Sequence, residues 1–282
     1  TRGSIGVNIM VALSNFAEMG RTSIAETVDV IFAGAVLPLD LPAYLDKDSE
    51  TMRVPIVSSS RAAKVICQKW RANYGYLPDA IVVEGPKAGG HLGFSNDQIE
   101  DEHYALELLI PDVVAVANSY RAEKAIPVIA AGGITTGEDI ARFIGLGASA
   151  VQMGSVFVPT DECDASVEFK KVYVNSSKED GRIIPGPVGM AGRAFDGEFI
   201  RAVEDGKEKP RSCPFHCIKT CDYTKSPYCI IKALYNAAKG NMKKGYAFAG
   251  TNAYLAEKIS SVKEVVDKVK ADYLLSKAVS HV

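Results

Sequence analysis

The sequence lacks an excess of charge of either sign. Its 282 residues include 32 Lys and Arg against 34 Asp and Glu, which gives a formal net charge of −2. A chain that binds nucleic acid usually shows a clear basic footprint, and none stands out here. We therefore expect a small-molecule substrate and no nucleic-acid partner, with a homodimer left open.

Long apolar runs and a secretory leader are also missing. No uninterrupted apolar stretch approaches the roughly 20 residues that cross a bilayer, and the first residues do not follow the signal-peptide pattern. The hydrophobic content of 47% is ordinary for a globular protein. These features predict a cytoplasmic protein without a membrane partner, in which the six cysteines are reduced thiols or metal ligands rather than disulfides.

Strand-like apolar runs recur along the first half of the chain, with helix-compatible segments between them. This alternation predicts βαβ units built around a parallel sheet. The helical pattern at 97–124 also contains Val113–Val116, which is compatible with a strand. After Val158 the strand signal stops, and we expect helices and loops that end in an amphipathic segment, Leu255–Ala278. The predicted strands are Ile5–Met10, Val28–Gly34, Val54–Ser58, Ala80–Glu84, Val128–Gly132 and Ala150–Gly154.

Two of these predicted strands end in glycine-rich turns that suit a bound anion. Gly132 and Gly133 follow one strand and lead through 135–138 into a helical pattern, while Gly154 and Ser155 follow the next. Glycine lets backbone N–H groups approach an anion, and a helix start adds a partial positive charge. A tight turn is the alternative for Gly132 and Gly133. The pairing of both turns favours phosphate, which (β/α)8 barrels bind after strands seven and eight.

His91 is the predicted catalytic residue. It follows Ala88-Gly-Gly directly after the predicted strand Ala80–Glu84, at the end of the sheet where barrels place reactive side chains. Its small neighbours, Gly89 and Gly90, leave room for a ring system, and an imidazole exchanges a proton near neutral pH. The alternative is a loop histidine satisfied by hydrogen bonds. Glu84 is a second candidate, either orienting His91 or a cofactor or binding a backbone amide.

Four of the cysteines lie close together in the sequence. Cys213, Cys217, Cys221 and Cys229 form a Cys-x3-Cys-x3-Cys-x7-Cys pattern. Four thiolates at this density suit an iron–sulfur cluster or a zinc ion, although the spacing matches no common zinc or ferredoxin signature. A helical turn that buries small sulfur atoms against the rest of the protein is the alternative.

Several motifs together resemble the nitronate monooxygenase (2-nitropropane dioxygenase) family, which also contains flavin-dependent enoyl-ACP reductases. The likeness runs from about Ser4 to Val158, with further similarity in 187–193 and 246–252. The combination of Ala-Gly-Gly-His with two phosphate turns is specific, whereas each motif alone is weaker. The motifs are Gly6-Val-Asn-Ile9, Glu84-Gly-Pro-Lys-Ala-Gly-Gly-His-Leu-Gly93, Ala130-Ala-Gly-Gly-Ile134 and Gln152-Met-Gly-Ser155.

The resemblance implies an FMN-binding α/β TIM (β/α)8 barrel. Only six strands can be counted, so we expect barrel strands 1 and 2 to be missing from this sequence. Residues 1–160 would form strands 3–8, and 161–282 a mostly helical C-terminal region, with the cysteine-rich segment 213–229, packed on the barrel. The resemblance also implies flavin contacts at Asn8, Gly132, Gly133, Gln152, Met153, Gly154 and Ser155, although Asn8 by itself could simply cap a strand end. Glu84, Gly89 and Gly90 join these cofactor candidates because of their positions beside His91.

The activity implied by the resemblance is FMN-dependent oxidation of alkyl nitronates or similar small carbon acids with O2. NAD(P)H-dependent, FMN-containing enoyl-ACP reduction is the alternative, followed by a flavin- or phosphate-binding protein without catalysis. Lys87 departs from the family pattern, because many members carry an acidic residue before Ala-Gly-Gly-His, and this leaves the substrate open. Arg193 either closes over an anionic substrate or pairs with Asp196 at the surface, and the surface pair is favoured.

Overall fold

The computed structural model describes residues 3–44, 49–187 and 189–279. Its main sheet has six parallel strands in the order β1-β2-β3-β4-β6-β7, and each strand agrees with a predicted run to within two residues. Apolar runs rich in Val, Ile and Ala are therefore strands, as the sequence predicts. Their bounds are β1 (Gly6–Met10), β2 (Val30–Gly34), β3 (Met52–Val57), β4 (Ile81–Glu84), β6 (Val128–Ala131) and β7 (Ala150–Gln152).

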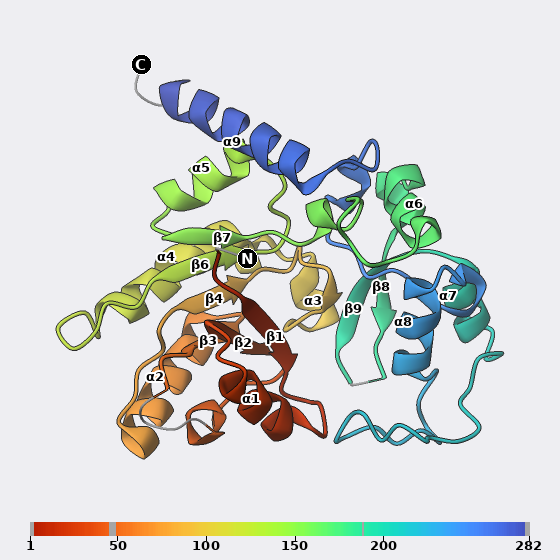
Figure 1. Ribbon diagram of the computed structural model, residues 1–282, viewed down its shortest axis with the longest axis horizontal. Coiled ribbons are helices and arrows are strands. Elements are labelled where there is room, and N and C mark those ends of the chain that lie inside the picture. Colours follow the sequence, from red (N-terminus) through yellow and green to blue (C-terminus); the bar gives the residue numbers. More distant parts are fainter. Residues whose placement is uncertain (1–2, 45–48, 188, 280–282) are drawn as a thin grey trace.

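Helices connect the parallel strands and cover one face of the sheet (Figure 1). The best defined is α2, which begins after the capping side chain of Ser59 and ends at left-handed Gly75. Its fully buried Trp70 packs in the main hydrophobic core. The predicted pattern at 97–124 divides into two α-helices, and Val113–Val116 is helical rather than a strand. The helices are α1 (Phe16–Ala25), α2 (Ser60–Tyr74), α3 (Asn96–Ile99), α4 (Leu106–Asn118) and α5 (Gly137–Gly145).

The sheet curls into a half-barrel whose two edges are β1 and β7. Its outer face packs on the helices, whereas a smaller apolar cluster that includes Val54, Val82 and Ala131 lies on the other face. These strands have apolar side chains on both faces of the sheet, as the strands of a barrel do. The fold class is therefore α/β and TIM-barrel-like, in agreement with the sequence prediction.

The expectation that no strand follows Val158 is wrong. Strands β8 (Gly181–Pro185) and β9 (Ala191–Phe195) form a three-stranded antiparallel sheet with the short β5 (Gly90–His91), in the order β5-β9-β8. Figure 1 shows this ribbon beside the main sheet. It escaped detection because its strands contain few β-branched residues and its third member has only two residues. The ribbon matters for the site because β9 pairs with the backbone of His91.

The other regular structure of the C-terminal region is helical, with long loops between the helices. It contains α6 (Val167–Asn175), α7 (Glu198–Glu204), α8 (Ile230–Ala238) and α9 (Val262–Val279), the last packed on α5 (Figure 1). Among the described residues, no helix combines the length and the apolar composition that a membrane span requires. Short 3-10 helices occur at Leu41–Tyr44, Glu102–Tyr104, Ser155–Phe157, Lys178–Asp180, Met242–Lys244 and Ala253–Leu255.

Candidate active site

A cavity of about 280 Å³ lies at the carboxyl ends of β4, β6 and β7. We call it the glycine-lined cavity. Parallel strands present their carboxyl ends at one edge of a sheet, which explains why residues distant in sequence meet here. The predicted cofactor residues that line it are Glu84, Gly89, Gly90, Gly132, Gly133, Gln152, Gly154 and Ser155.

The turn after β6 has a backbone that requires glycine. Gly132 and Gly133 have φ angles of +100° and +78°. A Cβ on Gly132 would lie 3.0 Å from the carbonyl oxygen of Gly85, and one on Gly133 would lie 2.8 Å from Cβ of Lys87. Both the left-handed conformation and the close packing exclude side chains, so the turn stays open to an approaching ligand.

The first turn of α5 offers fewer free backbone N–H groups to an anion than the sequence suggests. Thr136 and Asp139 form a capping box, and the carboxylate of Asp139 accepts the backbone N–H groups of Thr135 and Thr136. These amides are therefore already bonded within the protein. Donors for a phosphate in the cavity must come from the two glycine turns, together with the partial charge of the helix end.

Ser155 and Asn252 hold the two glycine turns in place. The amide of Asn252 donates to the carbonyl oxygen of Gly133 over 2.7 Å, and the backbone N–H of Gly250 donates to Oγ of Ser155 over 3.1 Å. The Ser155 hydroxyl keeps its own proton to donate. Residue-by-residue prediction missed Gly250 and Asn252, although both fall in the stretch 246–252, whose similarity to the family was the available signal.

A second cavity, of about 310 Å³, contains His91 and is called the His91 cavity here. Phe94, Tyr104 and Met190 also line it, and Glu84 lines both this cavity and the glycine-lined one. The side chain at the end of β4 therefore lies in a wall common to both spaces. A cofactor in one cavity and a small substrate in the other would meet near Glu84.

His91 is held by backbone pairing and by an aromatic neighbour. It pairs with Gly192 of β9, and its ring centroid lies 5.2 Å from that of Phe248 at an interplanar angle of 60°. Its Nε2 atom is buried and has no hydrogen-bond partner among the described residues. Burial lowers the pKa of His91, so the imidazole is neutral at pH 7 and one of its ring nitrogens can accept a proton.

Burial shifts the pKa of Glu84 upward, in the opposite direction to that of His91. Removal from water raises the pKa of this carboxyl group from 4.5 to about 7. A large fraction of Glu84 is therefore neutral near physiological pH. Two titratable groups with altered pKa values at one cavity wall are typical of a catalytic site.

Two of the ten predicted cofactor residues lie outside the glycine-lined cavity. Asn8 is exposed on the edge strand β1, and Met153 packs against the hydrophobic core. Met153 follows cavity-lining Gln152, and successive side chains near a strand end point in opposite directions. The side chain of Gln152 therefore lines the glycine-lined cavity, and that of Met153 points away from it.

The favoured surface pair of Arg193 with Asp196 is wrong. Asp196 pairs instead with Arg182 over 2.9 Å and with Arg201 over 3.1 Å. Arg193 is partly buried, donates from Nη2 to the carbonyl oxygen of Pro86, and has a buried Nε without a partner among the described residues. Arg193 thereby ties β9 to the loop that carries the Ala-Gly-Gly-His motif.

The cysteine-rich segment forms a loop before α8 rather than the helical turn considered above. Its four cysteines are partly buried free thiols. Within the described ranges, no group of three or more His, Cys, Asp or Glu side chains is placed to hold a metal ion, so the zinc and iron–sulfur hypotheses gain no support. Burial raises the pKa of both Cys217 and Cys221, which keeps these thiols protonated at neutral pH.

Comparisons with known proteins agree with this architecture. A probable nitronate monooxygenase from Staphylococcus aureus (strain Newman) is 36% identical over 123 residues, which are 43% of this chain and 33% of that relative. The match thus spans about a third of the curated relative. The structure of FabK from Thermotoga maritima has a TM-score of 0.77 and 25% identity, over 100% of this chain and 80% of that chain.

A nitroalkane oxidase from Streptomyces ansochromogenes shares the fold, with a TM-score of 0.68 and 21% identity, over 99% of this chain and 83% of that chain. The family model for nitronate monooxygenase matches residues 4–272, nearly the whole chain. Most of the motifs that carry this likeness line the two cavities described above, whereas Gly6-Val-Asn-Ile9 lies on the edge strand β1. This chain therefore belongs to the nitronate monooxygenase family of flavin-dependent oxidoreductases.

Proposed function

We propose that this chain oxidises small alkyl nitronates, or related carbon acids, with FMN as its cofactor and O2 as the electron acceptor. The observation that carries the proposal is the wall shared by the two cavities. The glycine-lined cavity suits a phosphate-bearing cofactor, and the adjoining His91 cavity has a partly buried proton acceptor and room for a small substrate.

The glycine-lined cavity fits the phosphate end of FMN. Gly132 and Gly133 expose backbone amides, Ser155 offers a hydroxyl, and a Cβ built on Gly90 or Gly154 would meet no atom within 4 Å. These are the donors and the free space that a phosphate and its ribityl chain need. When bound, the flavin supplies the two-electron chemistry that amino-acid side chains lack.

Lys87 adds a cation beside this turn. Its aliphatic chain packs over Gly133, and its side chain is exposed. Because this side chain lies against the glycine turn, we infer that Lys87 compensates part of the phosphate charge in this chain. Phosphate binding then depends on a charged side chain as well as on backbone amides and the Ser155 hydroxyl.

The protonation states of His91 and Glu84 determine the charge of the His91 cavity. Neutral His91 accepts the proton of a carbon acid at a ring nitrogen and, once protonated, forms an ion pair with the resulting anion. The raised pKa of Glu84 limits its negative charge near pH 7, so it repels a nitronate less than an ordinary carboxylate would. Both effects favour a small anionic substrate beside the cofactor.

The same site supports a second candidate, NAD(P)H-dependent reduction of an enoyl-ACP thioester. The likeness to FabK over the whole of this chain favours it. In that reaction His91 would donate a proton to the substrate rather than remove one. The lowered pKa of His91 leaves little imidazolium at neutral pH and so argues for the nitronate reaction.

The experiment that separates the two candidates is a spectral titration of the purified full-length protein. Propyl nitronate is added in air to one sample, and NADH is added to another without oxygen. Turnover of propyl nitronate with slow bleaching of flavin absorbance by NADH supports nitronate oxidation. Rapid bleaching by NADH without any response to propyl nitronate supports the reductase, and a colourless protein that takes up no FMN contradicts both.

A further inference from the structure

A third cavity, separate from the two described above, lies beside α7 and α8. It has a volume of about 580 Å³ and is bounded on one side by the chain at 207–215. None of its described lining residues lines the glycine-lined or the His91 cavity. Buried Phe199 and Tyr228 contribute apolar wall, and the volume lies within the range of roughly 300–1,000 Å³ typical of small-molecule sites. We call it the basic cavity.

The basic cavity concentrates positive charge in a chain whose net charge is −2. Its described lining includes a single carboxylate, Glu208, against five cations. Two of these cations have an acidic partner, since Lys244 lies 3.8 Å from Glu208 and Lys207 lies 2.7 Å from an aspartate outside the lining. The other three cations have no carboxylate within 4.0 Å among the described residues: Lys209, Arg211 and Lys232.

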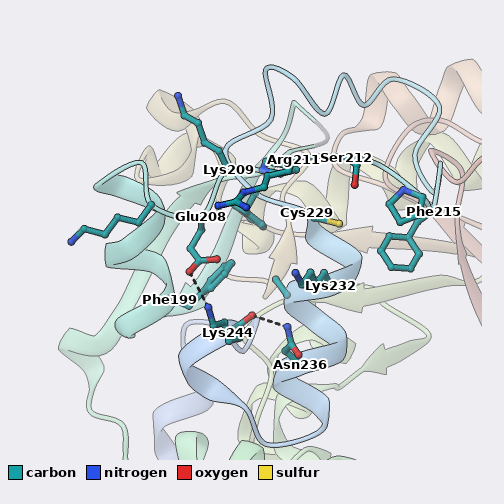
Figure 2. Close-up of a pocket in the computed structure, with 15 residues that line it drawn as sticks. Phe199, Glu208, Lys209, Arg211, Ser212, Phe215, Cys229, Lys232, Asn236 and Lys244 are labelled. Carbon is teal, nitrogen blue, oxygen red and sulfur yellow. Dashed lines mark hydrogen bonds and ion pairs between the residues drawn. The ribbon is translucent and has the colours of Figure 1, made fainter.

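Part of this charge lies on the wall of the basic cavity and is accessible from solvent. Figure 2 shows Arg211 and Lys232 on the cavity wall, where both side chains are exposed to a ligand, while the ammonium group of Lys209 points away. Like charges placed together repel one another, and a bound anion removes that repulsion. Arg211 is suited to bidentate binding of a phosphate, and Lys232 provides a point charge beside it.

The start of α8 adds to the same field. The helix runs from Ile230 to Ala238 for nine residues, and its N-cap residue Cys229, which lines the cavity, makes no side-chain capping hydrogen bond. The first backbone N–H groups of a helix have no partner within the helix and favour an anion nearby. Two independent features, the unpaired cations of the lining and the uncapped helix start, therefore meet at this wall.

We propose that the basic cavity binds a nucleoside diphosphate. The two phosphates would bind Arg211, Lys232 and the start of α8, and the nucleoside would lie against the aromatic side chains. Phe215, which is 51% exposed, offers its ring at the rim, whereas Phe199 packs on Tyr246 and forms the apolar floor. Inorganic phosphate alone would leave most of the 580 Å³ and these aromatic rings unused. The concave shape favours a small ligand over the surface of an acidic protein.

The test is isothermal titration calorimetry of the full-length protein with ADP, in the presence of saturating FMN so that the glycine-lined cavity does not contribute. ADP should bind to the wild type. Arg211→Gln and Lys232→Gln should each weaken binding by about tenfold or more, because each removes a charged phosphate contact. Lys171→Gln, an equal loss of charge at an exposed position on α6, should bind ADP like the wild type.

Further titrations separate the parts of the ligand. Adenosine and inorganic phosphate should each bind much more weakly than ADP. The proposal is overturned if ADP gives no binding, if Arg211→Gln and Lys232→Gln bind ADP like the wild type, or if inorganic phosphate binds as tightly as ADP. Binding of an oligoglutamate peptide in preference to ADP would also overturn it and indicate an acidic protein partner. As a control for intact folding, the thermal unfolding temperature of each variant is compared with that of the wild type.

Discussion

Replacement of Glu84 by Gln should stabilise the protein at alkaline pH and have little effect on stability at acid pH. Glu84 ends β4 in the wall shared by two cavities, and burial raises the pKa of its carboxyl group from 4.5 to about 7. Gln keeps the shape of the side chain and removes only the ionisation. The variant therefore isolates the free-energy cost of a negative charge at this position.

The sign follows from the direction of the pKa shift. The folded state holds the proton of Glu84 more tightly than the unfolded state does. The stability that this protonated carboxyl group contributes is therefore fully present below the unfolded pKa of 4.5 and is lost as pH rises through about 7. At about 1.4 kcal/mol per pKa unit, the upper bound on the loss is about 3 kcal/mol. Partial access of water to the cavity wall reduces this value.

Urea unfolding at about pH 5 and about pH 8 measures the effect, with flavin removed from both proteins so that ligand binding does not add to stability. At the higher pH the free energy of unfolding of Glu84→Gln should exceed that of the wild type by up to about 3 kcal/mol, and at the lower pH the difference should be small. Glu179→Gln, at an exposed position, should show no such trend. An equal difference at both pH values for Glu84→Gln would refute the reasoning.

Three further substitutions test the cofactor cradle by titration of the apoprotein with FMN. Gly133→Ala should lose most FMN affinity and about 1–3 kcal/mol of stability, because of its positive φ and the contact with Lys87, whereas Gly20→Ala on α1, which meets no atom within 4 Å, should bind FMN normally. Asn252→Ala should weaken FMN binding about tenfold by freeing the Gly133 carbonyl, and unchanged affinity would show that the turn holds itself. Lys87→Glu should weaken FMN binding more at low than at high salt, and a salt-independent effect would exclude a charge contribution.

The sequence predicts the parts of this site that depend on local pattern. Gly132 and Gly133 are recognisable because a buried strand followed by two glycines permits few backbone conformations. The position of His91 follows from the strand before it. The shared wall at Glu84 was not predictable, because it depends on how two cavities lie across the end of one strand.

Long-range pairing explains what the sequence does not reveal. β5 has only two residues and β9 has no β-branched residue, so their pairing with a neighbour rather than their own composition makes them strands. Asn252 is similar, since its contact with Gly133 spans 119 residues. The placement of the Met153 side chain against the core, opposite to Gln152, follows the alternation of side chains that the sequence already contains.

The central claim is that His91 handles the substrate proton or its anion beside the flavin. The most direct test is kcat/KM for propyl nitronate in the FMN-loaded wild type and in His91→Asn, measured from about pH 5 to about pH 9. We predict a loss of about 100-fold or more in the variant at equal flavin content, and a wild-type rate whose fall on the acid side occurs at a lower pH than that of an ordinary histidine, because burial lowers the pKa of His91. Equal kcat/KM in the two proteins across this range would contradict the account.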